Sequence, residues 1–291
     1  MVTINGGIGI IGGLTPWLAI PLALAALGAG TFWYLRRVWF YRDPVRVAPA
    51  EEGAILAPAD GQVVYIKPFR NGEVVAEKLG RPVKVEEITR APGAGDRGWI
   101  VGIYMSPLDV HFNYAPVDGQ VEGMVHTPAR VNLPMVDFWE YIRLTYLRRA
   151  VDLFSHRYRL VNERLTIFIN GDDLHLAMVE IADKFVNKIR CFISPGQVLS
   201  RGQKVSFIER GSQVDLLIFR EDVEFAVQVG QQVYGARTVV ARYRPAGGAD
   251  VHTKHVIPAG YEIGRIADSN QELAQPVPTG LPPLSPGEVE Q

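Results

Sequence analysis

A serine, a histidine and an aspartate have the best-defined chemical potential in this sequence: Ser212, which follows Gly211, together with His111 and Asp60. A serine hydroxyl is a poor nucleophile at its ordinary pKa, so it needs a base, and a third group best holds that base in place. A glycine before the serine obstructs attack on the backbone carbonyl least and tolerates strain. Taken alone, however, a Gly-Ser pair or an Asp before Gly most often forms a turn, and a lone His most often has a structural role. The surrounding motifs must decide.

Three longer motifs surround these residues in chain order. They read Phe40-Tyr41-Arg42-Asp43-Pro44 with Ala57-Pro58-Ala59-Asp60-Gly61-Gln62-Val63, then Ser106-Pro107-Leu108-Asp109-Val110-His111-Phe112-Asn113, and last Ile208-Glu209-Arg210-Gly211-Ser212. From Phe40 to Arg242 this succession resembles the phosphatidylserine decarboxylase family. The short Arg-Gly-Ser form of the last motif is similar to its compact bacterial and archaeal branch. Asn162-Glu163-Arg164 and Val179-Glu180-Ile181-Ala182 are also similar to family sequences.

The resemblance implies a proenzyme that cleaves itself between Gly211 and Ser212. The Ser212 hydroxyl would attack the Gly211 carbonyl to form an ester, and β-elimination would then free the upstream chain and leave dehydroalanine. Rearrangement and loss of ammonia would convert this residue into a covalent pyruvoyl group, which is the implied cofactor. The products, residues 1–211 and 212–291, would stay associated as a heterodimer that could assemble further.

In family terms, His111 and Asp60 resemble the histidine and aspartate that form a triad with the cleavage serine. His111 would be the general base, and Asp60 would fix its tautomer and orientation. The larger relatives carry a second histidine three positions after the first, where this sequence has Tyr114. Either His111 serves both cleavage and decarboxylation, or another residue such as His126 substitutes for the second histidine. We favour His111.

The implied reaction is the decarboxylation of phosphatidylserine to phosphatidylethanolamine. The pyruvoyl ketone derived from Ser212 would form a Schiff base with the substrate amine and act as an electron sink, and His111 is the expected proton donor. Two other substrates stay open: an ether-lipid relative such as archaetidylserine, and a different amine-bearing carboxylate. A non-catalytic interpretation also stays open, in which the chain is a membrane-tethered, lipoyl-like binding module with Gly211-Ser212 as an uncleaved turn.

Mainly strands must position these residues. From about Gly53 to Ala241, short runs of Val, Ile, Phe and Tyr are separated by Gly, Pro, Asn and Asp, which predicts a mainly β (α+β) fold with a multi-stranded core. Asn71-Gly72 and Asn170-Gly171 predict tight hairpin turns. Residues 55–64 and 193–205 each predict a strand, a glycine-containing turn and a second strand, similar to the barrel-sandwich hairpins of lipoyl-type domains.

One amphipathic helix is predicted between Pro134 and Phe154. Its apolar residues recur at intervals of three and four, while its arginines lie elsewhere on its surface. The apolar residues are Met135, Phe138, Trp139, Ile142 and Tyr146. A helix that lies in a membrane interface and a helix that covers the β core produce the same pattern. Both interpretations stay open.

The N-terminal segment carries the membrane signal. Residues 1–35 contain no Asp, Glu, Lys or Arg, and Ile8–Tyr34 is mostly apolar and long enough to span a bilayer core of about 30 Å. Arginines follow this run rather than precede it, which differs from a secretory signal peptide and places the downstream chain on the cytoplasmic side of the cell membrane. A single span is favoured over a re-entrant hairpin and over a hairpin packed on the domain.

Composition argues against several other classes of protein. The 30 Lys and Arg residues nearly balance the 31 Asp and Glu residues, so nothing favours nucleic acid as a partner. The single cysteine, Cys191, excludes an internal disulfide, and no ligand spacing in the motifs predicts a metal site. The expected organisation is a membrane anchor over residues 1–38, a self-cleaved catalytic domain over 39–267 and a disordered tail over 268–291.

Overall fold

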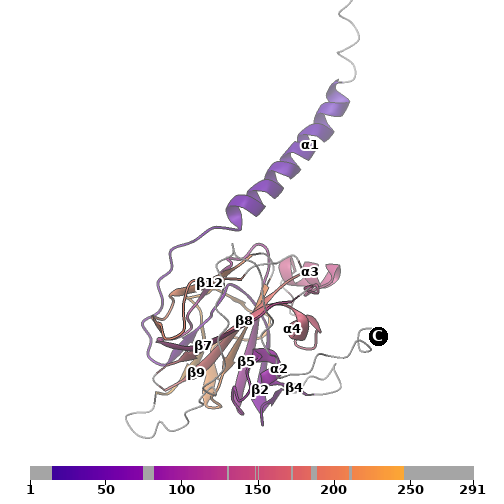
Figure 1. Ribbon diagram of the computed structural model, residues 1–291. Helices are drawn as coiled ribbons and strands as arrows, with labels where there is room; N and C mark the ends of the chain where they lie inside the picture. Colours follow the sequence, from indigo (N-terminus) through magenta and orange to yellow (C-terminus); the bar gives the residue numbers. More distant parts are fainter. Residues whose placement is uncertain are drawn as a thin grey trace, which may run out of the picture.

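The structure is a computed structural model of the 291-residue chain, and it describes residues 15–74, 82–129, 131–147, 149, 151–171, 173–184, 189–209 and 212–245. A long helix projects from a β domain that contains the other described elements (Figure 1). Arg210, Gly211 and the tail predicted over 268–291 lie outside the described residues.

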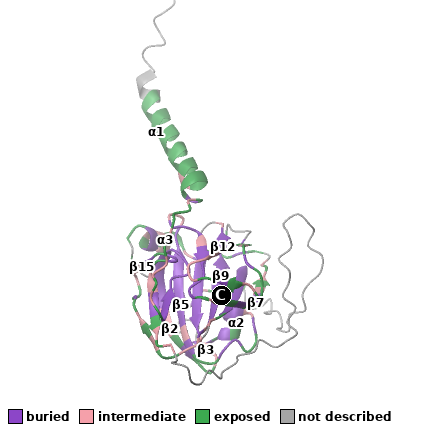
Figure 2. Ribbon diagram, turned by 90° about the vertical axis from the view of Figure 1, so that its left-hand side faces the viewer, coloured by how far each residue is buried: buried purple, intermediate pink, exposed green. Residues whose placement is uncertain are grey.

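The N-terminal helix is continuous. It consists of α1, Thr15–Tyr34, and a π-helical turn, η1, Leu35–Trp39. The stretch Ala19–Trp39 is long and apolar enough to cross a membrane, at about 1.5 Å per residue. Apolar side chains such as Ile20 and Leu24 are exposed along it (Figure 2). A hairpin packed on the domain is therefore contradicted, and one helix of spanning length is found instead.

Antiparallel strands form a large main sheet, which confirms the mainly β prediction. Their order is β11-β7-β8-β9-β13-β5-β2-β3-β4, and β15 pairs with β2. The strands are β2 Gly61–Arg70, β3 Glu73–Val74, β4 Val83–Lys84, β5 Gly98–Met105, β7 Gly119–Thr127, β8 Arg164–Asn170, β9 His175–Ala182, β11 Val198–Leu199, β13 Ser212–Ile218 and β15 Gln232–Val233. β13 is hydrogen-bonded on both sides, to β9 and to β5.

Two three-stranded sheets pack on one face of the main sheet. Their strands are β1 Ala54–Leu56, β14 Val223–Phe225 and β16 Val239–Tyr243 in one, and β6 Phe112–Tyr114, β10 Ile189–Cys191 and β12 Lys204–Ile208 in the other. Val214, Leu216 and Ile218 of β13 join them in one apolar core, whereas Leu217 belongs to a second core on the opposite face. Because both faces are covered, every residue of β13 is buried.

Short helices contribute to the second core. They are α2 Val85–Thr89, α3 Phe138–Thr145 and α4 Tyr158–Val161. Each places at least one buried apolar or aromatic side chain in this core, namely Ile88 of α2, Leu144 of α3 and Tyr158 of α4. The second face of the sheet is therefore covered by helices and loops, and the first by strands.

The helix predicted between Pro134 and Phe154 is shorter than expected, because Phe138–Thr145 is the only α-helix among the residues of this range that the structure describes. Asp137 caps its first turn: the Asp137 carboxylate accepts the backbone N–H of Glu140 at 2.8 Å, and the Glu140 carboxylate accepts the N–H of Asp137 at 3.1 Å. After the helix the chain turns back, so that Phe154 is buried in the second core.

Both predicted hairpins form, but their turns differ in length. Asn71 and Gly72 join β2 to β3 with φ values of 54° and 70°, the left-handed conformations that a two-residue turn requires. In the second hairpin Asn170 pairs with His175, so the connection between β8 and β9 spans residues 171–174. The Asn-Gly pair there begins a longer loop.

The two predicted strand–turn–strand segments also form, although the two strands of each do not pair with one another. In residues 55–64, β1 pairs with β16 and β2 pairs with β5. In residues 193–205, β11 pairs with β7, whereas β12 pairs with β10 and β6. Each turn therefore carries the chain from one sheet to another.

Candidate active site

Ser212 is the first residue of β13 and lies between two neighbouring strands. It is opposite Met105 of β5 and Ala182 of β9, and it is fully buried. The Ser212 hydroxyl donates to the Met105 sulfur at 3.1 Å. A thioether is a weak acceptor, so this contact holds the hydroxyl loosely. Gly211, the other residue of the expected cleavage site, lies outside the described residues.

His111 is a neutral, fully buried imidazole. Its Nδ1 lies 3.0 Å from the backbone carbonyl oxygen of Asp109, and its Nε2 has no hydrogen-bond partner in the described part of the chain. Burial lowers the pKa of His111 to about 3. Because a carbonyl can only accept, Nδ1 carries the proton and donates it, which leaves the lone pair on Nε2. This is the tautomer that a general base needs.

The loop that carries His111 is held by its own side chains. The Asp109 carboxylate accepts both the backbone N–H of Ser106, at 2.8 Å, and the Ser106 hydroxyl, at 2.7 Å. Gln232 of β15 donates to the other Asp109 oxygen at 2.9 Å. Ser106 and Asp109 therefore fix the loop, and through it the position of the imidazole.

The strand register brings Ser212 and His111 to one end of the main sheet. Ser212 pairs with Met105, the last residue of β5, and the short loop after β5 leads to His111. From the other direction, the backbone N–H of Ile208 donates to the His111 carbonyl at 3.1 Å, four residues before Ser212. Four residues span at most about 14 Å. The two residues therefore lie at the same end of the sheet, and no hydrogen bond joins their side chains among the described contacts.

Asp60 lies at the same end of the sheet, immediately before β2, but its partner differs from the expected one. Arg46 donates to the Asp60 carboxylate from both terminal nitrogens of its guanidinium group: Nη1 donates to Oδ1, and Nη2 donates to Oδ2 at 2.8 Å. The backbone N–H of Gly235 also donates to Oδ1, at 2.8 Å. The Arg46 and Asp60 side chains are only 6% and 5% exposed. The described contacts include no hydrogen bond from Asp60 to His111: Arg46 and Gly235 bind the carboxylate, and the Asp109 carbonyl orients the imidazole instead.

Tyr114 and His126, the two residues weighed beside His111, have other surroundings. The Arg46 guanidinium lies 5.0 Å from the centroid of the Tyr114 ring, and burial raises the pKa of Tyr114 to about 12, so its hydroxyl stays protonated at neutral pH. His126 lies on β7, three strands from β13 or about 14 Å, and its Nε2 is 3.0 Å from Glu163 Oε1. Of the two histidines, His111 alone combines full burial with an unpaired ring nitrogen in the described residues; the buried Tyr114 hydroxyl is also without a partner there.

A buried carboxyl group that the sequence analysis did not nominate lies on the Ser212 face of the sheet. Glu180 of β9 is opposite Val214, so Ser212 is its diagonal neighbour at about 7 Å. Glu180 Oε1 accepts the Ser206 hydroxyl at 2.5 Å, and Asn113 donates to the same hydroxyl oxygen at 2.9 Å. Burial raises the pKa of Glu180 to about 8, so it is mostly protonated at neutral pH. Its Oε2 has no partner in the described ranges.

One signal in the sequence could have revealed Glu180. It alternates with Met178 and Ala182 in a strand whose residues on that face are otherwise apolar. An ionisable residue at a core-facing position is costly unless it is paired or functional. The sequence shows that Glu180 alternates with apolar residues, but it does not show that both faces of the sheet are buried.

The other face of β13 carries a second buried polar network. Gln213 donates to the Tyr65 hydroxyl and to Asp215 Oδ1, both at 2.6 Å, and it accepts the Tyr158 hydroxyl. Asp215 Oδ2 is bound by Arg159 at 2.7 Å. These side chains tie β13 to β2 and α4 directly beside Ser212, so they hold the strand that carries the serine.

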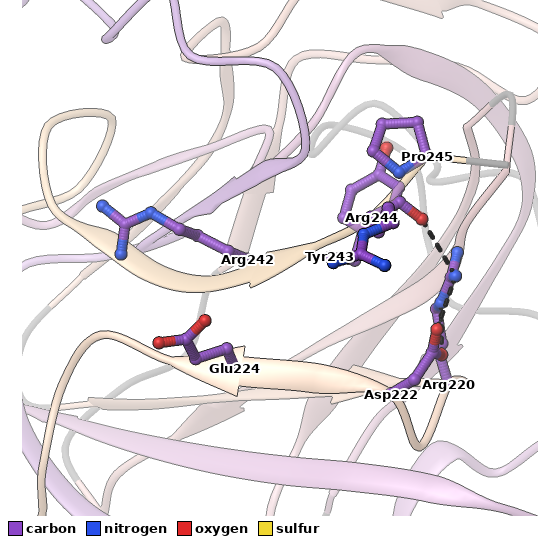
Figure 3. A pocket seen from close by; sticks show the side chains of 7 residues that line it. All are labelled: Arg220, Asp222, Glu224, Arg242, Tyr243, Arg244 and Pro245. Atoms are coloured by element: carbon purple, nitrogen blue, oxygen red, sulfur yellow. Dashed lines mark hydrogen bonds and ion pairs between the residues drawn. The ribbon is translucent and has the colours of Figure 1, made fainter. Parts of the chain in front are cut away.

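A surface depression of about 780 Å³ lies elsewhere (Figure 3). Its lining residues are Arg220, Asp222, Glu224, Arg242, Tyr243, Arg244 and Pro245. Arg220 lies two residues after the end of β13, whereas Ser212 is its first residue, so about 20 Å of strand separates the two places. Arg220 pairs with Asp222, and Arg242 pairs with Glu51. The depression is not part of the Ser212 site.

The surroundings of Ser212 suit a small covalent group built on this residue. In the described residues, no group of three or more His, Cys, Asp or Glu side chains could hold a metal ion. Around Ser212, by contrast, the side chains of Met105, Ala182 and Val214 form an apolar, buried surface. A small uncharged carbonyl group at this position would need no counter-charge.

Comparison with known proteins gives one consistent result. Residues 33–241 match the family described as phosphatidylserine decarboxylase. A phosphatidylserine decarboxylase proenzyme from Chlorobium limicola is 29% identical over 234 residues, which cover 80% of this chain and 92% of the relative. A proenzyme of the same name from Carboxydothermus hydrogenoformans is 31% identical over 238 residues, covering 78% and 94%. A protein from Methanocaldococcus jannaschii named "Putative archaetidylserine decarboxylase proenzyme" is 32% identical over 204 residues, covering 70% and 88%.

Proposed function

Because the chain belongs to the phosphatidylserine decarboxylase family, we propose that it is a membrane-bound proenzyme that cleaves itself between Gly211 and Ser212 and then decarboxylates a serine phospholipid. The family is one of decarboxylases, so the chain is a carboxy-lyase. One observation carries the proposal for the site. A buried serine at the start of the central strand β13 lies at the same end of the sheet as His111, a neutral histidine with an open Nε2.

Self-cleavage would begin when Ser212 Oγ attacks the carbonyl carbon of Gly211 and His111 Nε2 takes the hydroxyl proton. The peptide C–N bond then breaks, the nitrogen takes up the proton, and an ester joins Gly211 to the serine oxygen. Removal of the Ser212 Cα proton breaks the Cβ–O bond, so residues 1–211 leave with a C-terminal carboxylate. Water replaces the nitrogen of the remaining dehydroalanine tautomer, ammonia leaves, and a pyruvoyl group caps residues 212–291.

In the decarboxylation, the pyruvoyl group supplies an electron sink for the substrate amine to which it is joined. The other residues of the site handle protons and exclude water. The protonated Glu180 is a buried group at this end that can deliver a proton to the substrate carbon after CO2 leaves. His111, the donor that the family resemblance implies, can do so only after its Nε2 has taken up a proton. The apolar surface around Ser212 favours departure of a carboxylate, because its charge disperses in the transition state.

Asp60 enters the proposal as a charged residue of the site rather than as a direct partner of His111. Its carboxylate neutralises Arg46, which would otherwise be a buried cation at the same end of the sheet. Arg42 already opposes the protonation of His111, and an unpaired Arg46 would add to that effect during cleavage. Asp60 therefore supports the general base through charge.

The cleaved chain should remain one particle. β13 would become the start of the downstream chain, yet seven residue pairs hold it to β5 and seven to β9, both of which belong to the upstream chain. Cleavage removes none of these pairs. The proposed catalytic domain over residues 39–267 would therefore persist as a heterodimer of residues 1–211 and 212–291.

The membrane anchor in this proposal is α1, with the β domain on the cytoplasmic side. Arg36 and Arg37 lie in η1, at the domain end of the apolar helix, where the positive-inside rule places basic residues. A bilayer anchor brings the active site to a lipid substrate in two dimensions. Phosphatidylserine is the proposed substrate, and archaetidylserine is the alternative because of the relative from Methanocaldococcus jannaschii.

Intact mass spectrometry of the purified wild-type chain, Ser212→Ala and Ser200→Ala tests the cleavage. Ser200 is an exposed serine that lies outside the site and serves as the matched control. We expect two chains that divide between Gly211 and Ser212 in the wild type and in Ser200→Ala, and one chain in Ser212→Ala. The downstream chain should react with a hydrazide through its ketone. A folded wild-type chain that stays intact would overturn the proposal in favour of a binding module.

The substrate is tested separately on the cleaved enzyme. Vesicles that contain phosphatidylserine or archaetidylserine should release CO2, whereas free serine should not react. The lipid with the higher kcat/KM is the substrate. If a soluble amine-bearing carboxylate reacted faster than either lipid, the lipid assignment would be wrong while the cleavage result would stand.

A further inference from the structure

The helix α3 and the residue that follows it, Tyr146, expose aromatic side chains that an ordinary covering helix would bury. Phe138 is 70% exposed, Trp139 67% and Tyr146 65%. The residues of α3 that are buried are Leu144 and Thr145. Large apolar side chains grouped on one surface of a folded protein mark a place where something else binds. We call Phe138, Trp139, Tyr146 and the neighbouring Leu147, which is also exposed, the α3 patch.

The segment that leads into α3 is tied to the Ser212 end of the sheet. The backbone N–H of Met135 donates to the Asp183 carboxylate at 2.9 Å, directly after β9. Asn162 bridges the same two segments, since it donates to the carbonyls of Leu133 and Ala182, both at 2.8 Å. Ala182 is the residue opposite Ser212. The α3 patch is therefore anchored beside the strand end where Ser212 lies.

The base of the membrane helix reaches the same end from another direction. The Trp39 indole donates to the carbonyl of Leu108 at 3.1 Å, in the loop that carries His111. The Phe40 ring lies 4.1 Å from the imidazole of His111, between ring centroids. In two views at right angles, α3 lies at the end of the β domain from which α1 projects (Figures 1 and 2).

From this placement we propose that the α3 patch is a second membrane contact, which inserts Phe138 and Trp139 into the interfacial layer of the bilayer beside the Ser212 site. The occupant is the bilayer because α1 already directs this end of the domain toward it. Aromatic rings favour the headgroup level of a membrane. The exposed Arg143 and Arg149 flank the patch and suit an anionic lipid surface. The inference rests on the proposed membrane anchor and adds the path by which a lipid headgroup would reach the site.

Site-directed fluorescence in proteoliposomes tests this contact on the full chain. In a Cys191→Ser background, Trp139→Cys, Leu24→Cys and Lys84→Cys are labelled with the environment-sensitive dye NBD. Leu24 lies in α1, and the exposed Lys84 lies on β4, at the end of the domain away from α1 (Figure 1). Vesicles contain phosphatidylserine and phosphatidylcholine, with or without lipids that carry a bilayer-restricted nitroxide quencher.

We expect the quencher to reduce the fluorescence at position 139 several-fold more than at position 84, and to reduce it at position 24 as well. Quenching at 24 with none at 139 would overturn the α3 contact and leave the membrane anchor intact. No quenching at 24 would overturn the anchor itself. A blue-shifted dye at 139 that is insensitive to the quencher would mean that a second copy or another protein covers the patch, which also overturns the proposal.

A kinetic measurement gives an independent test. The double variant Phe138→Ser/Trp139→Ser should cleave itself at the wild-type rate, because neither side chain touches Ser212 or His111 in the described contacts. Its apparent KM for phosphatidylserine in vesicles should rise several-fold with kcat little changed. Val198→Ser, at an equally exposed apolar residue of β11, is the control and should leave KM unchanged. A double variant with wild-type KM would overturn the role of the patch in substrate entry.

Discussion

The two faces of β13 carry buried polar clusters that differ in how completely their hydrogen bonds are satisfied. On one face, both side-chain ends of Gln213 and both carboxylate oxygens of Asp215 have partners. Near Ser212, on and around the other face, His111 Nε2, Glu180 Oε2 and Asn113 Oδ1 have none within the described residues. One strand therefore borders two buried polar clusters, one with mostly paired atoms and one with several unpaired atoms.

This difference in hydrogen bonding suggests which residues stabilise the fold and which take part in chemistry. A buried polar atom without a partner costs about 1–3 kcal/mol, so a fold retains one mainly where a reacting group or substrate will use it. In the Gln213–Asp215 network, by contrast, the amide and carboxylate atoms are all paired and only Nε of Arg159 has no partner within the described residues, so this network stabilises one arrangement of its strand. Residues of the Gln213–Asp215 network should therefore affect stability most, and residues near Ser212 should affect cleavage most. The following variants test that division.

The largest effect is expected for His111→Ala. Loss of a general base slows a reaction by about 100-fold or more, so self-cleavage should fall by at least that factor. Its rate is measured by following the separation of the two chains over time on freshly folded protein. His126→Ala is the control and should cleave within about twofold of wild type. Wild-type cleavage in a folded His111→Ala chain would assign the base elsewhere.

Arg159→Leu should damage stability instead. It leaves the Asp215 carboxylate buried without its cation, and breaking such a pair costs about 3–5 kcal/mol. Chemical denaturation in detergent measures this loss. The cleavage rate per folded molecule should stay near that of the wild type. A stable Arg159→Leu chain that failed to cleave would erase the proposed difference between the two faces.

Asp60→Asn should affect both properties, because Asp60 pairs with a buried arginine and belongs to the proposed site. Adding Arg46→Met removes the uncompensated cation, so the double variant should recover most of the stability lost in the single one. Cleavage should slow by about tenfold or more in Asp60→Asn, and it should recover in the double variant, because no unpaired cation is left to oppose the protonation of His111. Cleavage that stayed slow in a stable double variant would show that Asp60 acts by more than neutralising Arg46.

The smallest effect is expected for Glu180→Gln and appears as a pH dependence. Burial raises the Glu180 pKa to about 8, so between its ordinary value and pH 8 the folded chain holds a proton that the unfolded chain releases. Stability from this group is therefore present at low pH and is lost as pH rises to about 8. The lowered pKa of His111 acts oppositely, since its stability is lost as pH falls below about 6.5.

The useful window is therefore pH 6.5 to 8, where His111 is neutral in the folded chain and becomes mostly neutral in the unfolded chain. Wild-type stability should fall across it by up to about 1.4 kcal/mol per pH unit, and Glu180→Gln should flatten this slope. Glu224→Gln, at an exposed residue of β14, should keep the slope. A slope that survived Glu180→Gln would show that another group titrates there.

Local patterns predicted several elements because local physics decides them. Asn71-Gly72 forms the expected turn, since both residues tolerate positive φ. The apolar run formed one helix, as expected for an uncharged stretch long enough to cross a bilayer core. The helix between Pro134 and Phe154 was overextended, because the return of Phe154 to the core depends on a sheet that the local pattern does not reveal.

The sequence by itself determined the mainly β class, the apolar helix and the motifs that identify the family and nominate Ser212, His111 and Asp60. Tertiary structure decided which atoms those side chains meet: Asp60 meets Arg46 and Gly235, and His111 meets the Asp109 carbonyl. It also decided that Glu180 is buried diagonally from Ser212. The physical reason is register. Contacts between strands far apart in the chain depend on how every strand of the sheet aligns, and no short stretch of sequence encodes that alignment.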